Sequence, residues 1–118
     1  MSVPERPADC LFCKVVAGDV PSETVHATDT AVAFRDINPQ APMHVLVVPV
    51  SHYANAAELA HAEPSCAAEL LSVAAAVAEK EGVTDYRLVF NTGARAGQVV
   101  FHTHLHVIGG RPMGWPPG

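Results

Sequence analysis

The chain has 118 residues, of which 49% are hydrophobic, and its 12 acidic and seven basic side chains give a formal net charge of −5. This length predicts one domain that buries roughly two-thirds of its unfolded surface and folds without disulfides. The acidic balance, without any run of Lys or Arg, argues against a nucleic-acid polymer or an anionic membrane as partner, because both require clustered cations.

The N-terminal residues 1–9 are polar and contain prolines, so we expect a flexible segment before a single domain over residues 10–118. The start lacks the apolar region of a signal peptide, and no apolar stretch approaches the length of a membrane span. Three cysteines, an odd number, do not predict a secreted disulfide framework. We therefore expect a cytoplasmic protein with reduced thiols.

Helical and extended patterns then alternate along the chain. Residues 11–16 predict a short helix that ends near Gly18, and residues 23–26 and 31–35 predict two strands joined by a tight turn. A proline-rich loop over residues 38–42 leads into a buried strand over residues 44–50. Apolar residues at helical spacing predict the main helix over residues 64–81, with Pro64 in its first turn and Gly82 just past its end. A strand over residues 86–90 and a glycine-bearing loop over residues 91–98 follow. The pattern predicts an α+β fold with an antiparallel sheet.

Three histidines at alternate positions are the most informative feature of the C-terminal part. His102, His104 and His106 predict a strand whose three imidazoles line one face about 7 Å apart, where they can hold a phosphate or a metal. The opposite, core-facing side of this strand is expected to carry Phe101, Thr103, Leu105 and Val107. The competing interpretations are a polar strand that faces solvent and a metal-binding histidine tract. A neutral imidazole is a good nucleophile toward phosphorus, and the central His104 is best placed to attack.

Cys10 and Cys13 have the spacing of one half of a structural zinc site, which needs two further ligands from elsewhere in the chain. A thioredoxin-like redox motif has the same spacing, but no βαβ pattern follows it. The third cysteine, Cys66, lies in the predicted main helix and is more simply a small apolar side chain.

Two further segments suit a nucleotide, although each has a simpler structural interpretation. The glycines of the 91–98 loop allow its backbone to approach an anion closely, but such a loop is more often an ordinary turn. Asp36 can accept hydrogen bonds from ribose hydroxyls beside the apolar Phe12, Phe34 and Ile37, or it can be a turn residue beside ordinary core side chains.

The order of these motifs resembles the histidine triad family. The resemblance rests on residues 36–44, the buried strand, His52, the alternating histidines and the terminal residues 114–118, and it extends from Cys10 to Gly118. Within that family the chain is most similar to the Hint branch, the purine nucleoside phosphoramidases. The resemblance implies a five-stranded antiparallel sheet with two helices, extended across a homodimer.

The resemblance also implies a function and the residues that perform it. The expected activity is hydrolysis of the P–N bond of purine nucleoside 5′-phosphoramidates, or of acyl-adenylates, through a nucleotidyl-histidine intermediate. His104 would be the nucleophile, and His106 and His44 would complete the catalytic relay. Substrate contacts are expected from His104 and His106. They are also expected from Leu11, Phe12, Val15, Phe34, Asp36, Ile37, Asn91, Gly97, Gln98 and Val99. A structural zinc is expected on Cys10, Cys13, His52 and His102, as in many bacterial relatives, and catalysis would need no cofactor.

One position departs from the family pattern. Hint enzymes usually have Ser or Thr where this chain has Val99, so a hydroxyl that would assist the leaving amine is absent. The alternatives to a phosphoramidase are a dinucleoside polyphosphate hydrolase of the same superfamily and a zinc-stabilised module that binds nucleotides or a partner with little catalysis.

Overall fold

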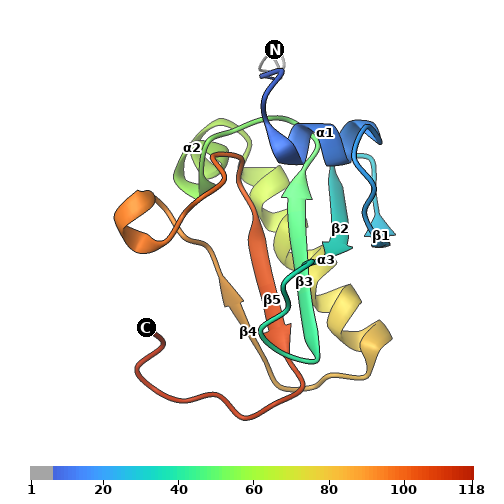
Figure 1. Ribbon diagram of the computed structural model, residues 1–118, viewed down its shortest axis with the longest axis vertical. Coiled ribbons are helices and arrows are strands. Elements are labelled where there is room, and N and C mark those ends of the chain that lie inside the picture. Colours follow the sequence, from blue (N-terminus) through green and yellow to red (C-terminus); the bar gives the residue numbers. More distant parts are fainter. Residues whose placement is uncertain (1–6) are drawn as a thin grey trace.

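Five antiparallel strands form one sheet, in the order β1-β2-β3-β5-β4, in the computed structural model, which describes residues 7–118 (Figure 1). The strands are β1 (Thr24–Ala27), β2 (Ala31–Arg35), β3 (Met43–Pro49), β4 (Tyr86–Val89) and β5 (Leu105–Gly109). The central strand β3 is buried along its whole length, whereas β1 and β4 form the two edges. The predicted α+β fold with a five-stranded antiparallel sheet is confirmed.

The long helix α3 (Pro64–Glu81) covers one face of the sheet and lies behind it in Figure 1. Its bounds are those predicted, and it ends at Gly82, whose φ of 71° is easily reached only by glycine. The main core forms where α3 meets the central strands, and it includes Leu70, Val73, Val77, Val45, Val47, Leu105 and Val107. These side chains supply the apolar burial that stabilises the fold.

The second face of the sheet is covered at one end by α1 (Leu11–Ala17). A smaller core lies there, in which Phe12 and Cys13 of α1 pack with Phe34, Leu46 and Val48. Successive side chains of a strand point to opposite faces. Because Val45 and Val47 face α3, the alternate side chains of β3 face α1, and His44 is one of them.

A third helix, α2 (Ala56–Ala62), is absent from the predicted elements. The side chain of Asn55 caps it by accepting the backbone N–H of Glu58 at 3.0 Å. Leu59 is its one buried residue, so the helix has little of the apolar periodicity that reveals helices in a sequence. The capping residue followed three positions later by Glu58 was the available signal.

The predicted histidine strand is shorter than expected, and this prediction is corrected. Strand β5 begins at Leu105, so His102 and His104 precede it. The register pairs Val47 with Leu105, which places Pro49 opposite Thr103, and proline has no N–H to donate. The N–H of Thr103 instead donates to the carbonyl of Tyr53 at 2.8 Å. The ladder between β3 and β5 therefore ends at Leu105.

The expected core face of this segment is correct at three of four positions. Thr103, Leu105 and Val107 are buried, but Phe101 is 52% exposed, because the chain has left the sheet at that point. Phe101 was therefore assigned wrongly to the core.

The predicted flexible segment, residues 1–9, lies largely outside the described residues. Residues 7–9 belong to a turn in which the N–H of Cys10 donates to the carbonyl of Pro7 at 3.2 Å. Among residues 7–118, no helix combines the length and apolar character needed to cross a membrane.

Candidate active site and metal site

His104 lies beside α1 on the second face of the sheet and is 7% exposed. Its Nδ1 is 2.8 Å from the carbonyl oxygen of His102. A carbonyl oxygen only accepts, so Nδ1 carries the proton and donates it. The Phe12 ring meets the imidazole edge-on, with 4.9 Å between the ring centroids. The ring of His104 is thus fixed in orientation, and its Nε2 keeps a lone pair.

The proton positions on His44 and His106 follow from a backbone amide. The N–H of Gln40 donates to Nδ1 of His44 at 3.0 Å, so the proton of the neutral His44 ring is on Nε2. This Nε2 lies 2.9 Å from Nδ1 of His106 and donates to it. The proton of the neutral His106 ring is therefore on Nε2.

Burial keeps both of these rings neutral. Desolvation lowers the pKa of His44, and the nearby Asp36 carboxylate only partly opposes it. For His106, burial and then the neighbouring His104 and His44 lower the pKa to about 4. At neutral pH the two rings therefore act as neutral donors and acceptors.

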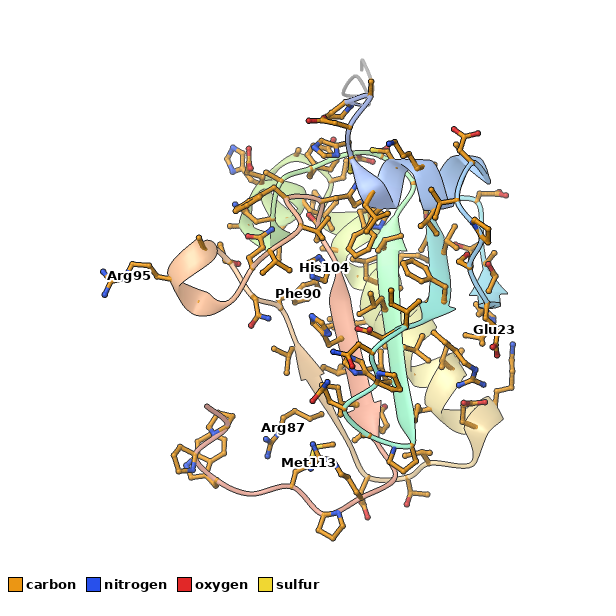
Figure 2. The ribbon with its side chains drawn as sticks, viewed as in Figure 1. Glu23, Arg87, Phe90, Arg95, His104 and Met113 are labelled. Carbon is orange, nitrogen blue, oxygen red and sulfur yellow. The ribbon has the colours of Figure 1, made fainter. Side chains whose placement is uncertain are left out.

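Two of the three alternating histidines, His104 and His106, border an apolar cavity of about 370 Å³. Figure 2 shows His104 at the start of β5, and Arg95 projecting away from the body of the protein. Nine of the twelve predicted substrate-contact residues line this cavity, namely Leu11, Phe12, Val15, Phe34, Asp36, Ile37, Val99, His104 and His106. Ile37 and Val99 are 98% and 82% exposed, so they form its rim. An apolar cleft with a few polar groups on one side is typical of a small-molecule site.

The other three predicted contacts, Asn91, Gly97 and Gln98, are not among the residues that line the cavity. The buried side chain of Gln98 organises its own loop, because its Oε1 accepts the N–H of Gly93 at 2.8 Å. Its Nε2 donates to the carbonyls of Ala54 and Val100. A contact of these residues with substrate stays a prediction.

Asp36 is a turn residue that also borders the cavity, and its role as a ribose ligand stays a prediction. Its Oδ1 accepts the N–H of Asn38 at 2.8 Å, as in an Asx turn. Its Oδ2 lies 3.4 Å from Nε2 of His44 and faces the site. One oxygen therefore shapes the loop, while the carboxylate also lines the cavity.

Cys10, Cys13, His52 and His102 converge from distant parts of the chain, with their ligand atoms within 4.8 Å of one another. The Sγ of Cys13 is 3.4 Å from Nδ1 of both His52 and His102. A tetrahedral zinc with ordinary bond lengths separates its ligand atoms by about 3.3–3.8 Å. The Nε2 of His102 is 2.9 Å from the carbonyl of Pro49 and donates to it, which leaves the Nδ1 lone pair for a metal. The donor set and geometry fit zinc.

A second group, Asp36, His44 and His106, also has its potential ligand atoms within 4.8 Å of one another. However, the Gln40 amide keeps the proton of His44 on Nε2, the nitrogen that would have to bind the metal. This group therefore fits a hydrogen-bonded relay better than a metal site.

Several residues of the site were missed in the sequence. Leu46 and Val100 line the cavity, and the amide of Gln40 sets the proton positions of the relay. Leu46 could have been found, because it is two residues from His44 in a strand and shares its face. The role of the Gln40 amide could not, because a backbone contact leaves no residue pattern.

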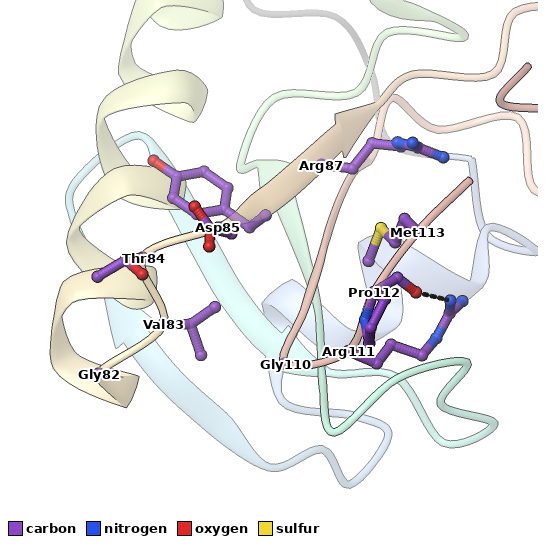
Figure 3. Close-up of a pocket in the computed structure, with 10 residues that line it drawn as sticks. Gly82, Val83, Thr84, Asp85, Arg87, Gly110, Arg111, Pro112 and Met113 are labelled. Atoms are coloured by element: carbon purple, nitrogen blue, oxygen red, sulfur yellow. Dashed lines mark hydrogen bonds between the residues drawn. The ribbon is translucent and has the colours of Figure 1, made fainter. Parts of the chain in front are cut away.

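A larger cavity of about 660 Å³ lies at the other end of β4 and β5 (Figure 3). It is lined by residues 82–87 and 110–113, which include no histidine or cysteine. It has none of the nucleophiles of the smaller cavity, so the smaller one is the candidate active site.

The chain is similar to known proteins in sequence and in structure. The family model described as HIT domain matches residues 17–113. The purine nucleoside phosphoramidase of Escherichia coli is 38% identical over 108 residues, covering 90% of this chain and 91% of that protein. The 14 kDa zinc-binding protein of Zea mays is 44% identical over 114 residues, covering 92% and 87% of the two chains.

Among solved structures, a HIT family hydrolase from Legionella pneumophila superposes with a TM-score of 0.89 at 44% identity, covering 93% of this chain and 100% of that one. The family model matches residues 17–113, and the two relatives and the solved structure cover 90–93% of this chain. The chain belongs to the HIT family.

Proposed function

We propose that this protein is a nucleotide-binding hydrolase that cleaves the P–N bond of purine nucleoside 5′-phosphoramidates, or the corresponding bond of acyl-adenylates. The observation that carries the proposal is the tautomer of His104, whose Nδ1–H is bound by the His102 carbonyl. In the proposed mechanism its Nε2 lone pair is the nucleophile, and His104 lines the cavity. The similarity to the E. coli phosphoramidase supports the same reaction.

In the first step, the Nε2 lone pair of His104 forms a bond to phosphorus as the bond to the leaving amine breaks. The amine takes up a proton through His106 or from water, and His104 carries the nucleotidyl group. In the second step, water attacks phosphorus as the bond to His104 breaks, and the proton that this water loses replaces the one given to the amine by His106 or by water. The products are the nucleoside monophosphate and regenerated His104. This two-step route divides one difficult displacement into two easier ones.

The remaining cavity residues would bind and orient the nucleotide. The apolar side chains of Leu11, Phe12, Val15, Phe34 and Ile37 suit a flat purine, and the Asp36 carboxylate suits the ribose hydroxyls. His44 and His106 are both neutral and share a hydrogen bond of 2.9 Å. The Nε2–H of His106 would therefore donate to the phosphoryl group or to the leaving atom.

The residues Cys10, Cys13, His52 and His102 would hold one zinc ion with a structural role. Two thiolates and two imidazoles close the coordination sphere, so no position remains for substrate or a reactive water. The similarity to the zinc-binding protein of Zea mays supports the metal. The site needs reduced thiols, which agrees with the expected cytoplasmic location.

We further propose a homodimer formed through the edge strand β4 and helix α3. Tyr86 and Leu88 of β4 are 38% exposed, and Leu71 of α3 is 47% exposed. An open strand edge with apolar side chains is a surface that a second copy can cover by extending the sheet.

A substrate panel tests the reaction. We expect hydrolysis of adenosine phosphoramidate and acyl-adenylate to be much faster than that of diadenosine polyphosphates. Preferential hydrolysis of the polyphosphates would identify the alternative hydrolase of the superfamily. Tight AMP binding without hydrolysis of any of these would identify a nucleotide-binding module instead.

A further inference from the structure

The segment that follows β5 holds the loop that carries the Gln40 amide. The Nε of Arg111 donates to the carbonyl oxygen of Gln40 at 2.9 Å. Next to it, Gly110 has a φ of 91°, and a Cβ there would lie 3.1 Å from the Cβ of Pro42. The C-terminal segment therefore contacts the loop at two adjacent points. Figure 3 shows Arg111 just beyond Gly110, with its guanidinium also bonded to the Pro112 carbonyl.

A series of hydrogen bonds, joined at one point through the backbone of Gln40, leads from this contact to the cavity. Arg111 binds the carbonyl of Gln40, and the N–H of the same residue donates to Nδ1 of His44 at 3.0 Å. His44 in turn donates to His106 at 2.9 Å, and His106 lines the cavity. Gln40 thus contacts a surface arginine through its carbonyl and His44 through its N–H. The orientation of Gln40 therefore influences which nitrogen of His106 carries the proton.

We propose that Arg111 is a positioning residue for catalysis, which fixes the Gln40 amide against His44 and so selects the Nε2–H tautomer of both His44 and His106. Arg111 does not line the cavity, so it acts on the reaction without binding the nucleotide. The inference rests on the proposed function for its kinetic consequence, but the tautomer that it assigns is independent of any activity.

Other hydrogen bonds within the loop already hold much of it in place without Arg111. The Asx turn at Asp36 and the bond from the Gln40 side chain to the Asn38 carbonyl already order the first half of the loop. The Gln40 carbonyl accepts from Arg111, and beyond it Gly110 lies close to Pro42 before β3 begins at Met43. Removal of the guanidinium should therefore loosen the amide rather than unfold the loop.

Arg111→Met is the test variant, and Arg87→Met is its matched control. Arg87 also donates from its guanidinium to a carbonyl of the C-terminal segment, that of Gly114 at 2.8 Å, but it does not contact the Gln40 loop. Arg87→Met loses one guanidinium bond to a backbone carbonyl, and Arg111→Met loses two, those to the carbonyls of Gln40 and of the adjacent Pro112. Of these contacts, only the one with Gln40 reaches the loop that carries the amide, so a difference in the His44 tautomer between the variants reports that contact.

The first measurement is the ¹⁵N NMR spectrum of the imidazole rings, which distinguishes protonated from unprotonated ring nitrogens. In the wild type and in Arg87→Met, we expect His44 and His106 to carry their protons on Nε2. In Arg111→Met, the His44 signals should shift toward the Nδ1–H tautomer. A wild-type His44 with its proton on Nδ1, or an unchanged tautomer in Arg111→Met, would overturn the proposal.

The second measurement is the kinetics of adenosine phosphoramidate hydrolysis. Arg111→Met should lower kcat about fivefold, the effect of losing roughly one hydrogen bond, with KM unchanged. Arg87→Met should keep the wild-type kcat, and Arg111→Lys, which retains a donor, should recover most of it. Equal losses in the two Met variants, or a change confined to KM, would contradict the positioning role.

The two proposals fail in different ways. A wild-type protein that hydrolyses none of the substrates refutes the proposed function, while the NMR spectra still decide the tautomer. A wild-type enzyme that hydrolyses the phosphoramidate, with an Arg111→Met variant equal to it in both measurements, refutes only the role of Arg111.

Discussion

Neighbouring histidines of the triad use opposite ring nitrogens for their fixed contacts. His102 donates from Nε2 to the Pro49 carbonyl, which leaves Nδ1 toward the cysteines. His104 donates from Nδ1 to the His102 carbonyl, which leaves the lone pair on Nε2. In the proposed function, this difference in tautomer would let two histidines two positions apart serve a metal site and a reaction.

The alternation of the histidines predicted that their imidazoles would share one face. It did not predict which ring nitrogen of each imidazole carries the proton. The tautomers depend on the carbonyls of Pro49 and His102 and on the amide of Gln40. Backbone groups are present at every position, so nothing in the sequence distinguishes the ones that make these contacts. The cavity residues Phe12, Phe34 and Asp36 were predictable only through the family resemblance. Apolar residues are usually core, and an Asp at such a position is usually a turn residue.

At the residue scale, Val99→Thr should raise kcat for an adenosine phosphoramidate with an alkylamine leaving group. Val99 lies at the exposed rim of the cavity, and a positioned hydroxyl that delivers a proton contributes on the order of 10²-fold in rate. Threonine is nearly isosteric with valine, so the affinity for AMP should change little. Steady-state kinetics and calorimetry measure the two quantities.

An acyl-adenylate is the control substrate, because its carboxylate leaves without a proton. The gain for Val99→Thr should be much smaller with this substrate. An equal gain with both leaving groups, or none with either, would show that this position does not assist the leaving group.

Also at the residue scale, His106 should destabilise the folded state in mild acid. Its pKa in the fold is about 4, whereas the ordinary value is 6.5. As the pH falls through this interval, the unfolded chain binds a proton that the folded chain does not, so the free energy of unfolding decreases. Urea denaturation should show a steeper loss between these pH values in the wild type than in His106→Gln. Parallel curves for the two proteins would contradict the low pKa.

At the scale of elements, the four proposed zinc ligands connect α1 to the ends of two strands. Cys10 and Cys13 lie at the start of α1, His52 follows β3, and His102 precedes β5. The sequence predicted α1 and α3 from caps and periodicity, but it could not show that Pro49 ends the ladder before His102. That shortened strand releases His102 from the sheet and allows it to reach the cysteines.

Loss of the zinc site should therefore loosen α1 and lower the thermal stability. We expect Cys13→Ala to lower Tm by about 10 °C, since loss of a structural metal is among the most destabilising changes. Cys66→Ala is the matched control, because Cys66 is a buried thiol on α3 outside the metal cluster. Metal analysis should find one zinc per chain in the control and little in Cys13→Ala. Equal Tm values and no zinc in the wild type would refute the site.

At the scale of the whole molecule, the sheet leaves β4 as an open edge at the side remote from α1 (Figure 1). The fold class follows from patterns along the chain, whereas the strand order was seen only in the structure, and assembly depends on a surface that no periodicity marks. The exposed Leu88 on this edge is the residue best suited to test it.

Light scattering tests the proposed dimer. The wild type should have twice the 12.4 kDa mass of one chain, and Leu88→Arg should shift it toward the monomer, because a charge at an apolar interface is costly to bury. Val99→Arg, at a more exposed apolar position on the cavity rim (82% against 38% for Leu88), is the control and should remain dimeric. A monomeric wild type at micromolar concentration would contradict the assembly.

The central claim is that His104 attacks phosphorus through its Nε2, and intact-mass spectrometry during turnover tests it most directly. Wild-type protein mixed with adenosine phosphoramidate and quenched rapidly should carry one adenylyl group, located on His104 by peptide mapping. His104→Ala should carry none and should lose hydrolysis, while it still binds AMP through the cavity residues. An adenylyl group on another residue, or phosphoramidate hydrolysis by His104→Ala at the wild-type rate, would contradict the account.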